Sequence, residues 1–149
     1  MTEQMSVKIA ALPSLRLTVE AHGLMAKKAL GQNFLLDQNI TDKIINLSLQ
    51  KQNKKDFSGA NVFEVGPGPG GLTRAVLAAE PKSLTVVEMD ERCIAIMNEI
   101  KEKTGDILHI INGDAMQTDF SVLAPAPRHI ISNLPYNISV PLLVGWLKN

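Results

Sequence analysis

The sequence predicts an α/β protein with a parallel sheet, and two observations lead to that prediction. From residue 61 onward, short apolar runs alternate with longer stretches whose apolar positions repeat at the period of a helix. Turn residues, mostly glycine, aspartate and asparagine, follow the apolar runs. Strands that alternate with helices form right-handed parallel crossover units, which bind ligands at the carboxyl ends of their strands. We therefore expect a ligand site at that edge of the sheet.

Four strands and two helices are expected between residues 61 and 132. The strands are expected at residues 62–65, 84–87, 107–111 and 128–132, and the helices at residues 72–79 and 91–103. Pro81 ends the first of these helices and Gly105 ends the second. After the fourth strand, the apolar pattern of residues 140–148 favours a further helix.

The first 36 residues are interpreted as a lead-in segment, and residues 37–149 as the domain itself. Ser14 can cap a short helix that stops at Gly23, and an irregular loop is expected after it. Asp37 can then cap a helix whose apolar positions repeat at the helical period. The lead-in is therefore expected to contain one helix and one loop.

Composition narrows the class of protein. The chain has 149 residues, of which 45% are hydrophobic, and equal numbers of acidic and basic side chains. No apolar run approaches the length of a membrane span and no basic leader precedes a hydrophobic block, so we expect a cytoplasmic protein with no membrane partner. The single cysteine, Cys93, excludes a disulfide within the chain and is expected in the core. The three histidines have no metal-ligand spacing, and we predict no metal site.

Residues 133–136, Asn-Leu-Pro-Tyr, follow the fourth expected strand and suit the binding of a flat, amine-bearing base. The side-chain carbonyl of Asn133 can accept a hydrogen bond from an exocyclic amine. Pro135 has no N–H and a fixed φ, which leaves the Leu134 carbonyl available for a second hydrogen bond. Tyr136 can stack on the base. The alternative is an ordinary strand-to-helix turn in which Tyr136 is half-buried.

Three upstream stretches favour the base-binding interpretation. The turn at residues 66–71, Gly-Pro-Gly-Pro-Gly-Gly, allows close approach of a ligand, and its prolines remove the N–H donors that a pyrophosphate needs. Glu88 can accept hydrogen bonds from both ribose hydroxyls of an adenosine. Asp114 can accept one from the adenine amino group, with Met116 as an apolar wall. Each residue alone is equally well a turn or cap, but their order after successive strands predicts an adenosine site.

These stretches resemble the successive motifs of the S-adenosylmethionine-dependent ribosomal RNA adenine dimethyltransferases. The similar stretches are residues 63–70, 87–90, 113–116 and 133–139, and residues 30–35 are similar to the motif that precedes them. The resemblance is strongest to the KsgA type of the family and spans residues 14–148. It implies a Rossmann-like class I methyltransferase fold of seven strands, of which about four are present, and a C-terminal helical domain that is absent here.

The resemblance also implies roles for matched residues. Cofactor contacts are expected for Asn33, Leu35, Gly66, Gly68, Glu88, Met89, Asp114, Ala115 and Asn133. Catalytic contacts around the target base are expected for Asn133, Leu134, Pro135 and Tyr136. The cofactor would be S-adenosylmethionine, and methyl groups would pass directly to the exocyclic amino nitrogens of two adjacent adenines near the 3′ end of small-subunit ribosomal RNA. The expected partner is that RNA or its pre-ribosomal particle.

The length of the chain leads to one further structural expectation and leaves two alternative functions open. Because the fourth strand is central in the family's strand order, we expect it to form an exposed edge through which the chain can associate with itself. An inactive or non-catalytic fragment that binds cofactor or RNA is one alternative function. A methyltransferase that acts on large-subunit ribosomal RNA is another.

Overall fold

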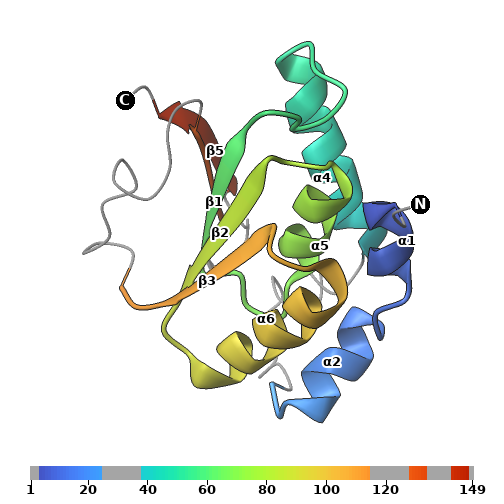
Figure 1. Ribbon diagram of the computed structural model, residues 1–149, viewed down its shortest axis with the longest axis vertical. Helices are drawn as coiled ribbons and strands as arrows, with labels where there is room; N and C mark the ends of the chain where they lie inside the picture. The colour runs from blue at the N-terminus through green and yellow to red at the C-terminus, as the bar shows by residue number, and fades with distance from the viewer. Residues whose placement is uncertain (1–3, 25–37, 115–127, 134–141, 148–149) are drawn as a thin grey trace.

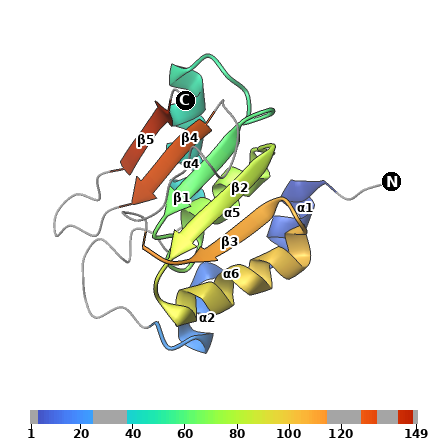
Figure 2. The same cartoon turned by 60° about the vertical axis from the view of Figure 1, so that its left-hand side comes forward.

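The computed structural model describes residues 4–24, 38–114, 128–133 and 142–147, and in the last two stretches the backbone alone. Figures 1 and 2 show the helices and strands, whose labels are used throughout. The helices are α1 (Met5–Ala10), α2 (Leu15–Ala21), α4 (Gln38–Lys51), α5 (Gly71–Ala78) and α6 (Glu91–Thr104). The strands are β1 (Asn61–Val65), β2 (Ser83–Glu88), β3 (Leu108–Asn112), β4 (Arg128–Asn133) and β5 (Leu142–Leu147).

The strands form one sheet in the order β3-β2-β1-β4-β5 (Figure 2). Strands β1 to β4 are parallel to one another, whereas β5 is antiparallel to β4. The order 3-2-1-4 is that of a doubly wound α/β fold, in which the strand order reverses at β1. The expected Rossmann-like class is therefore confirmed, and its reversal point lies between β1 and β4.

The core lies between the sheet and the helices α4, α5 and α6, which cover one of its faces (Figure 1). Apolar side chains alternate along the strands because successive residues point to opposite faces. The strand residues that face this core include Val62, Leu84, Val86 and Leu108, and the helix residues include Leu72, Val76, Ile96, Met97 and Ile100. Each such side chain contributes about 1.5–3 kcal/mol by leaving water.

Most of the predicted elements are present. Strands β1 to β4 and helices α5 and α6 lie within one residue of their expected bounds. Helix α2 begins where expected, because the Leu17 N–H donates to the Ser14 hydroxyl at 3.2 Å. Helix α4 begins at Gln38, immediately after the expected cap, Asp37, which lies outside the described residues. Helix α1 was not predicted. The division of the chain at residue 36 stays a prediction.

The helix expected at residues 140–148 is wrong, because Leu142–Leu147 form strand β5. A short apolar run has no period that separates a buried helix from a strand. Strand β4 without β5 would leave a row of backbone N–H and C=O groups unpaired, and β5 pairs with them from Arg128 to Asn133. The exposed edge expected on β4 is therefore also wrong. Within the described residues, no helix is long and apolar enough to cross a membrane.

Candidate functional site

The carboxyl ends of four strands bring the predicted site residues into one row. Val65 lies opposite Val87 on one side and opposite Ser132 on the other. The Gly66 N–H then donates to the Val87 carbonyl at 3.0 Å, and the Gly113 N–H donates to the Glu88 carbonyl at 3.0 Å. Asn133, which follows Ser132, is therefore level with the glycine-rich turn on the other side of β1. The order along this edge is Gly113, Glu88, Gly66 and Asn133.

The glycine-rich turn borders open space at two of its glycines. Gly66, Gly68 and Gly70 have φ values of +64°, +56° and +96°, which glycine adopts readily and other residues rarely do. Among the described residues, a Cβ on Gly66 or Gly68 would meet no atom within 4 Å, whereas a Cβ on Gly70 would lie 2.9 Å from Ile100 Cδ1. Gly70 therefore serves the packing of α5 on α6. Gly66 and Gly68 leave room in which a ligand can lie against the backbone.

The Glu88 carboxylate is fixed by three backbone N–H groups. Its Oε2 accepts from Met89 at 2.9 Å and from Asp90 at 3.1 Å. Among the described residues, its Oε1 accepts one of these bonds. This bond is the longest of the three, at 3.3 Å from the Gly68 N–H in the glycine-rich turn. A carboxylate oxygen can accept about two hydrogen bonds. Oε1 is therefore the oxygen best able to accept from ligand hydroxyls, and the bond to Gly68 keeps it beside the open space of the glycine-rich turn.

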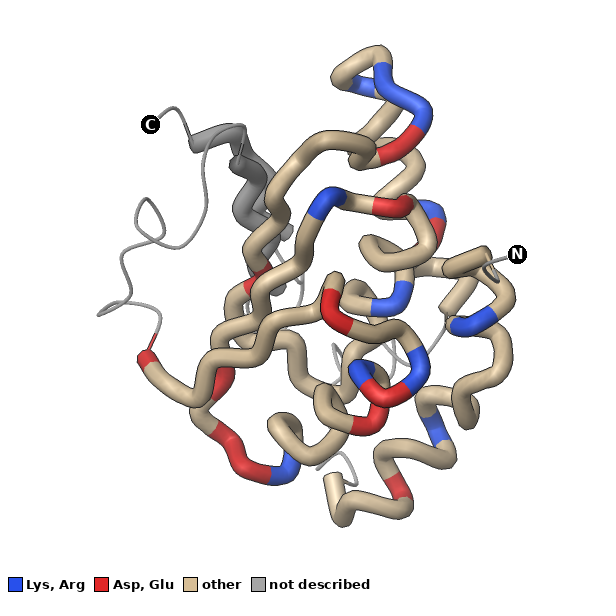
Figure 3. Tube along the Cα trace, in the orientation of Figure 1, with Lys and Arg blue, Asp and Glu red and all other residues tan. Residues whose placement is uncertain are grey.

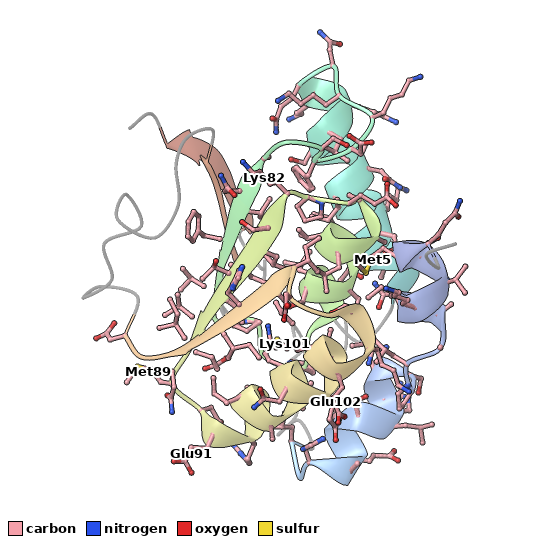
Figure 4. All side chains as sticks on the ribbon, in the orientation of Figure 1. Met5, Lys82, Met89, Glu91, Lys101 and Glu102 are labelled. Carbon is pink, nitrogen blue, oxygen red and sulfur yellow. The ribbon has the colours of Figure 1, made fainter. Side chains whose placement is uncertain are left out.

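Met89 and Asp90 complete the turn after β2. Met89 is 67% exposed although it is large and apolar, and Figure 4 shows it at the end of β2, pointing away from the core. A flexible thioether in such a place can pack on a flat ring. The Asp90 side chain caps α6 by accepting from the Arg92 N–H at 2.8 Å, and hydrogen bonds from Arg92 lower the pKa of Asp90. Asp90 thus holds the turn in shape.

Glu64 is a buried carboxyl group that was not predicted as a site residue from the sequence. It lies on β1, is only 1% exposed, and accepts a hydrogen bond of 2.5 Å from the Thr73 hydroxyl. Burial raises its pKa to about 7, the hydrogen bond from Thr73 opposes that shift, and the charge of Glu88 adds to it. The signal was a glutamate within an apolar strand, two residues before the glycine-rich turn. Perturbed carboxyl groups of this kind concentrate at functional sites.

Several predicted site residues lie outside the described part of the chain. These are Asn33, Leu35, Ala115, Leu134, Pro135 and Tyr136. Of Asn133 the structure describes the backbone, at the end of β4. The structure thus brings together the glycine-rich turn, Glu88, Met89, Asp114 and the backbone of Asn133. Within residues 4–24 and 38–114, no cluster of three or more histidine, cysteine or acidic side chains is arranged to hold a metal ion.

Relatives of known type match most of this chain. A protein of Gluconobacter oxydans is 51% identical over 138 residues, which cover 93% of this chain and 44% of the relative. A protein of Agrobacterium fabrum is 49% identical, with coverage of 93% and 49%. Both are named ribosomal RNA small subunit methyltransferase A. The chain thus spans about half the length of the curated relatives that it matches.

Comparisons of structure and of family models agree with these relatives. A predicted RNA methyltransferase of Pyrococcus horikoshii superposes with a TM-score of 0.57 at 17% identity, over 93% of this chain and 60% of that one. At that identity the likeness concerns the fold alone. The model of the ribosomal RNA adenine dimethylase family matches residues 23–149. A match over that much of the sequence shows that the chain belongs to the ribosomal RNA adenine dimethylase family.

Proposed function

We propose that this chain carries the cofactor-binding part of an S-adenosylmethionine-dependent enzyme. The enzyme dimethylates the amino nitrogens of two adjacent adenines near the 3′ end of small-subunit ribosomal RNA. Membership of the family and the names of the relatives support the reaction. The observation that carries the proposal is the row formed by Gly113, Glu88, Gly66 and Asn133 at one edge of the sheet. A cytoplasmic location and a pre-ribosomal partner belong to the same proposal.

The described residues fit S-adenosylmethionine. The Oε1 atom of Glu88 is available to the ribose hydroxyls, and exposed Met89 follows it to pack on the adenine. Asp114, at the end of the next strand, is proposed to accept from the adenine amino group. The open space beside Gly66 and Gly68 would take the methionine end of the cofactor. The carboxyl groups of this edge also suit a ligand that carries a sulfonium and an ammonium group.

The protein's contribution to the reaction is alignment. The bound cofactor supplies an electrophilic methyl group. Asn133, Leu134, Pro135 and Tyr136 are proposed to hold the adenine so that its amino nitrogen faces that methyl group. The nitrogen forms the new C–N bond as the C–S bond breaks, and a proton then leaves the nitrogen. Holding two reactants in line can lower a barrier by about 7–11 kcal/mol in well-oriented systems. No covalent intermediate with the protein is required.

Two measurements test the proposal. Calorimetric titration with S-adenosylmethionine should give one site per chain, and absence of binding by the folded chain would overturn the proposal. A labelled-methyl assay on small-subunit precursor particles then measures transfer. Binding without transfer would favour the alternative of a fragment that binds cofactor but has no activity. Methylation of large-subunit RNA instead would favour the other alternative substrate, and mapping the labelled nucleotides distinguishes the two.

A further inference from the structure

The first turn of α5 contacts three other parts of the molecule. The Gly71 carbonyl accepts a hydrogen bond of 3.2 Å from Gln38 Nε2 at the start of α4. The Thr73 hydroxyl donates to Glu64 on β1. The Arg74 guanidinium donates from Nη1 to the Pro13 carbonyl at 2.6 Å, and from Nη2 to Thr18 Oγ1 at 3.2 Å. Helix α5 begins at Gly71, the last residue of the glycine-rich turn, so these contacts fix the helix that continues that turn.

Arg74 is unusual among these residues because it is a buried cation. It is 5% exposed, its Nε has no hydrogen-bond partner in the part of the chain that the structure describes, and burial lowers the pKa of Arg74. Among the described residues no carboxylate forms an ion pair with it. A buried charge contributes less to stability than an apolar side chain of similar size. Stability alone is therefore a poor explanation for an arginine here, whereas two directed hydrogen bonds to one segment fix that segment's position.

The segment that Arg74 holds is α2 and the residue before its cap. At its other end, the chain leaves α2 at Gly23, whose carbonyl accepts from Arg92 Nη1 at 3.2 Å. Arg92 in turn binds Asp90 in the turn after Glu88. After residues 25–37 the next described residue is Gln38, whose side chain donates a hydrogen bond to the Gly71 carbonyl. Helix α2 and the start of α4 are thus both tied to the first turn of α5, and the end of α2 is tied to the turn beside Glu88.

We propose that Arg74 is a positioning residue for cofactor binding, which holds the lead-in helix α2 on the helix that begins at the glycine-rich turn. Arg74 does not contact the cofactor. Its two hydrogen bonds hold the chain on the amino-terminal side of residues 25–37 against the first turn of α5, directly after the glycines at residues 66, 68 and 70. This inference rests on the proposed function, because it presupposes that S-adenosylmethionine binds beside those two features.

The test separates affinity from stability. Arg74→Met keeps an unbranched apolar chain at this position but removes the guanidinium group, and with it both hydrogen bonds and the charge. We expect the Kd for S-adenosylhomocysteine, measured by calorimetry, to rise by about tenfold, the size of a typical coupling between sites. We expect the variant to remain folded at the temperature of the titration, which a thermal melting curve checks, so that a raised Kd reports affinity and not unfolding. Arg74→Lys, which can reach one acceptor but not both, should restore part of the affinity. Arg16→Met, on exposed α2 surface, is the matched control.

The outcomes distinguish the inference from the function on which it rests. If the unaltered chain binds no cofactor, the proposed function is overturned, and the inference with it. If the unaltered chain binds and Arg74→Met binds equally well, the inference alone is overturned. If Arg74→Met does not fold, Thr18→Val removes one acceptor while it leaves the arginine in place. A folded Thr18→Val chain with unchanged Kd would overturn the inference, and a Kd raised several-fold would support it.

Discussion

The two ends of the parallel sheet differ in charge. At the carboxyl end, Glu88, Asp90, Glu91 and Asp114 lie at the end of β2 or in the segments that follow β2 and β3. At the amino end, Lys51, Lys54, Lys55 and Lys82 lie at the end of α4, in the loop before β1 and just before β2. Figure 3 shows the acidic turn after β2 and the basic residues beyond α4 well apart.

This difference indicates which ligand each end suits. An acidic edge attracts a cationic cofactor and repels the phosphates of RNA. A strand of five residues spans about 16 Å, which exceeds the Debye length of about 8 Å at physiological salt. The lysines of the amino end therefore do little to offset the acidic edge. The described residues of that edge thus suit the cofactor, and under the proposed function the RNA would be attracted by other residues than these.

The largest expected effect concerns Glu88. Glu88→Ala removes the carboxylate proposed to accept from the ribose hydroxyls. It also removes the hydrogen bond between that carboxylate and the Gly68 N–H of the glycine-rich turn. Hydrogen bonds to charged groups contribute about 1.5–3 kcal/mol each, so we expect the Kd for S-adenosylmethionine to rise by at least about a hundredfold. Glu102→Ala, at the other end of α6, is the control and should bind normally. Equal affinities of the two variants, measured by calorimetry, would contradict the assignment of the ribose site.

The second prediction concerns the dependence of stability on pH. The folded chain keeps Glu64 protonated up to about pH 7, whereas the unfolded chain ionises it above about 4.5. The stability contributed by this proton is therefore present below pH 4.5 and is lost as pH rises to 7. Glu64→Gln should accordingly exceed the unaltered chain in unfolding free energy by about 3 kcal/mol at pH 8 and match it at pH 4. Urea unfolding at several pH values measures this, and parallel curves would refute it.

A third prediction separates two glycines of the same turn. Gly70→Ala should lower the free energy of unfolding by about 2 kcal/mol, because its Cβ would strike Ile100 and the backbone has positive φ. Gly66→Ala should cost only about 1 kcal/mol, from backbone strain alone. The order should reverse for cofactor affinity, which Gly66→Ala should lower more. Denaturant unfolding and calorimetry on both variants check this, and the same order in both measurements would argue against the proposed cofactor position.

The smallest effect is expected at the amino end. Reversing two charges there, in Lys54→Glu with Lys55→Glu, should change the Kd for S-adenosylmethionine by less than about twofold at physiological salt, because screening acts over that distance. Stability should change by less than about 0.5 kcal/mol, as for other exposed positions. A change of fivefold or more in the Kd would show that the two ends of the sheet are not electrically independent.

The sequence predicted the parts of the molecule that have local signals. Strands β1 to β4 are each bounded by turn residues, and Ser14 marks the start of α2 by a cap. Helix α1 has no buried residue, so its sequence has no apolar pattern from which a helix could be predicted. The strand β5 was mistaken for a helix because its pairing with β4 is a contact that the residues of β5 do not encode locally.

The candidate site shows the same limit. Glycines, Glu88 and Asp114 stand in motifs, and their order along the chain predicted the row that they form. Glu64 was missed because burial raises its pKa, and the extent of that burial depends on the folded chain. The coupling of Arg74 to Pro13 joins residues that are far apart in sequence and carry no shared motif. Side-chain contacts of that kind cannot be read from spacing.

The central place of β1 has a consequence for the speed of folding. Asn61 faces Ser83 of β2, a partner 22 residues away, but β1 meets β4 only after the chain has passed through β2, α6 and β3. Closing a longer loop loses more entropy, and non-local pairings form slowly. We expect β1, α5 and β2 to assemble first, and the β4–β5 pair to dock on them last. The step that brings Asn133 beside Gly66 would then limit the rate at which a complete site forms.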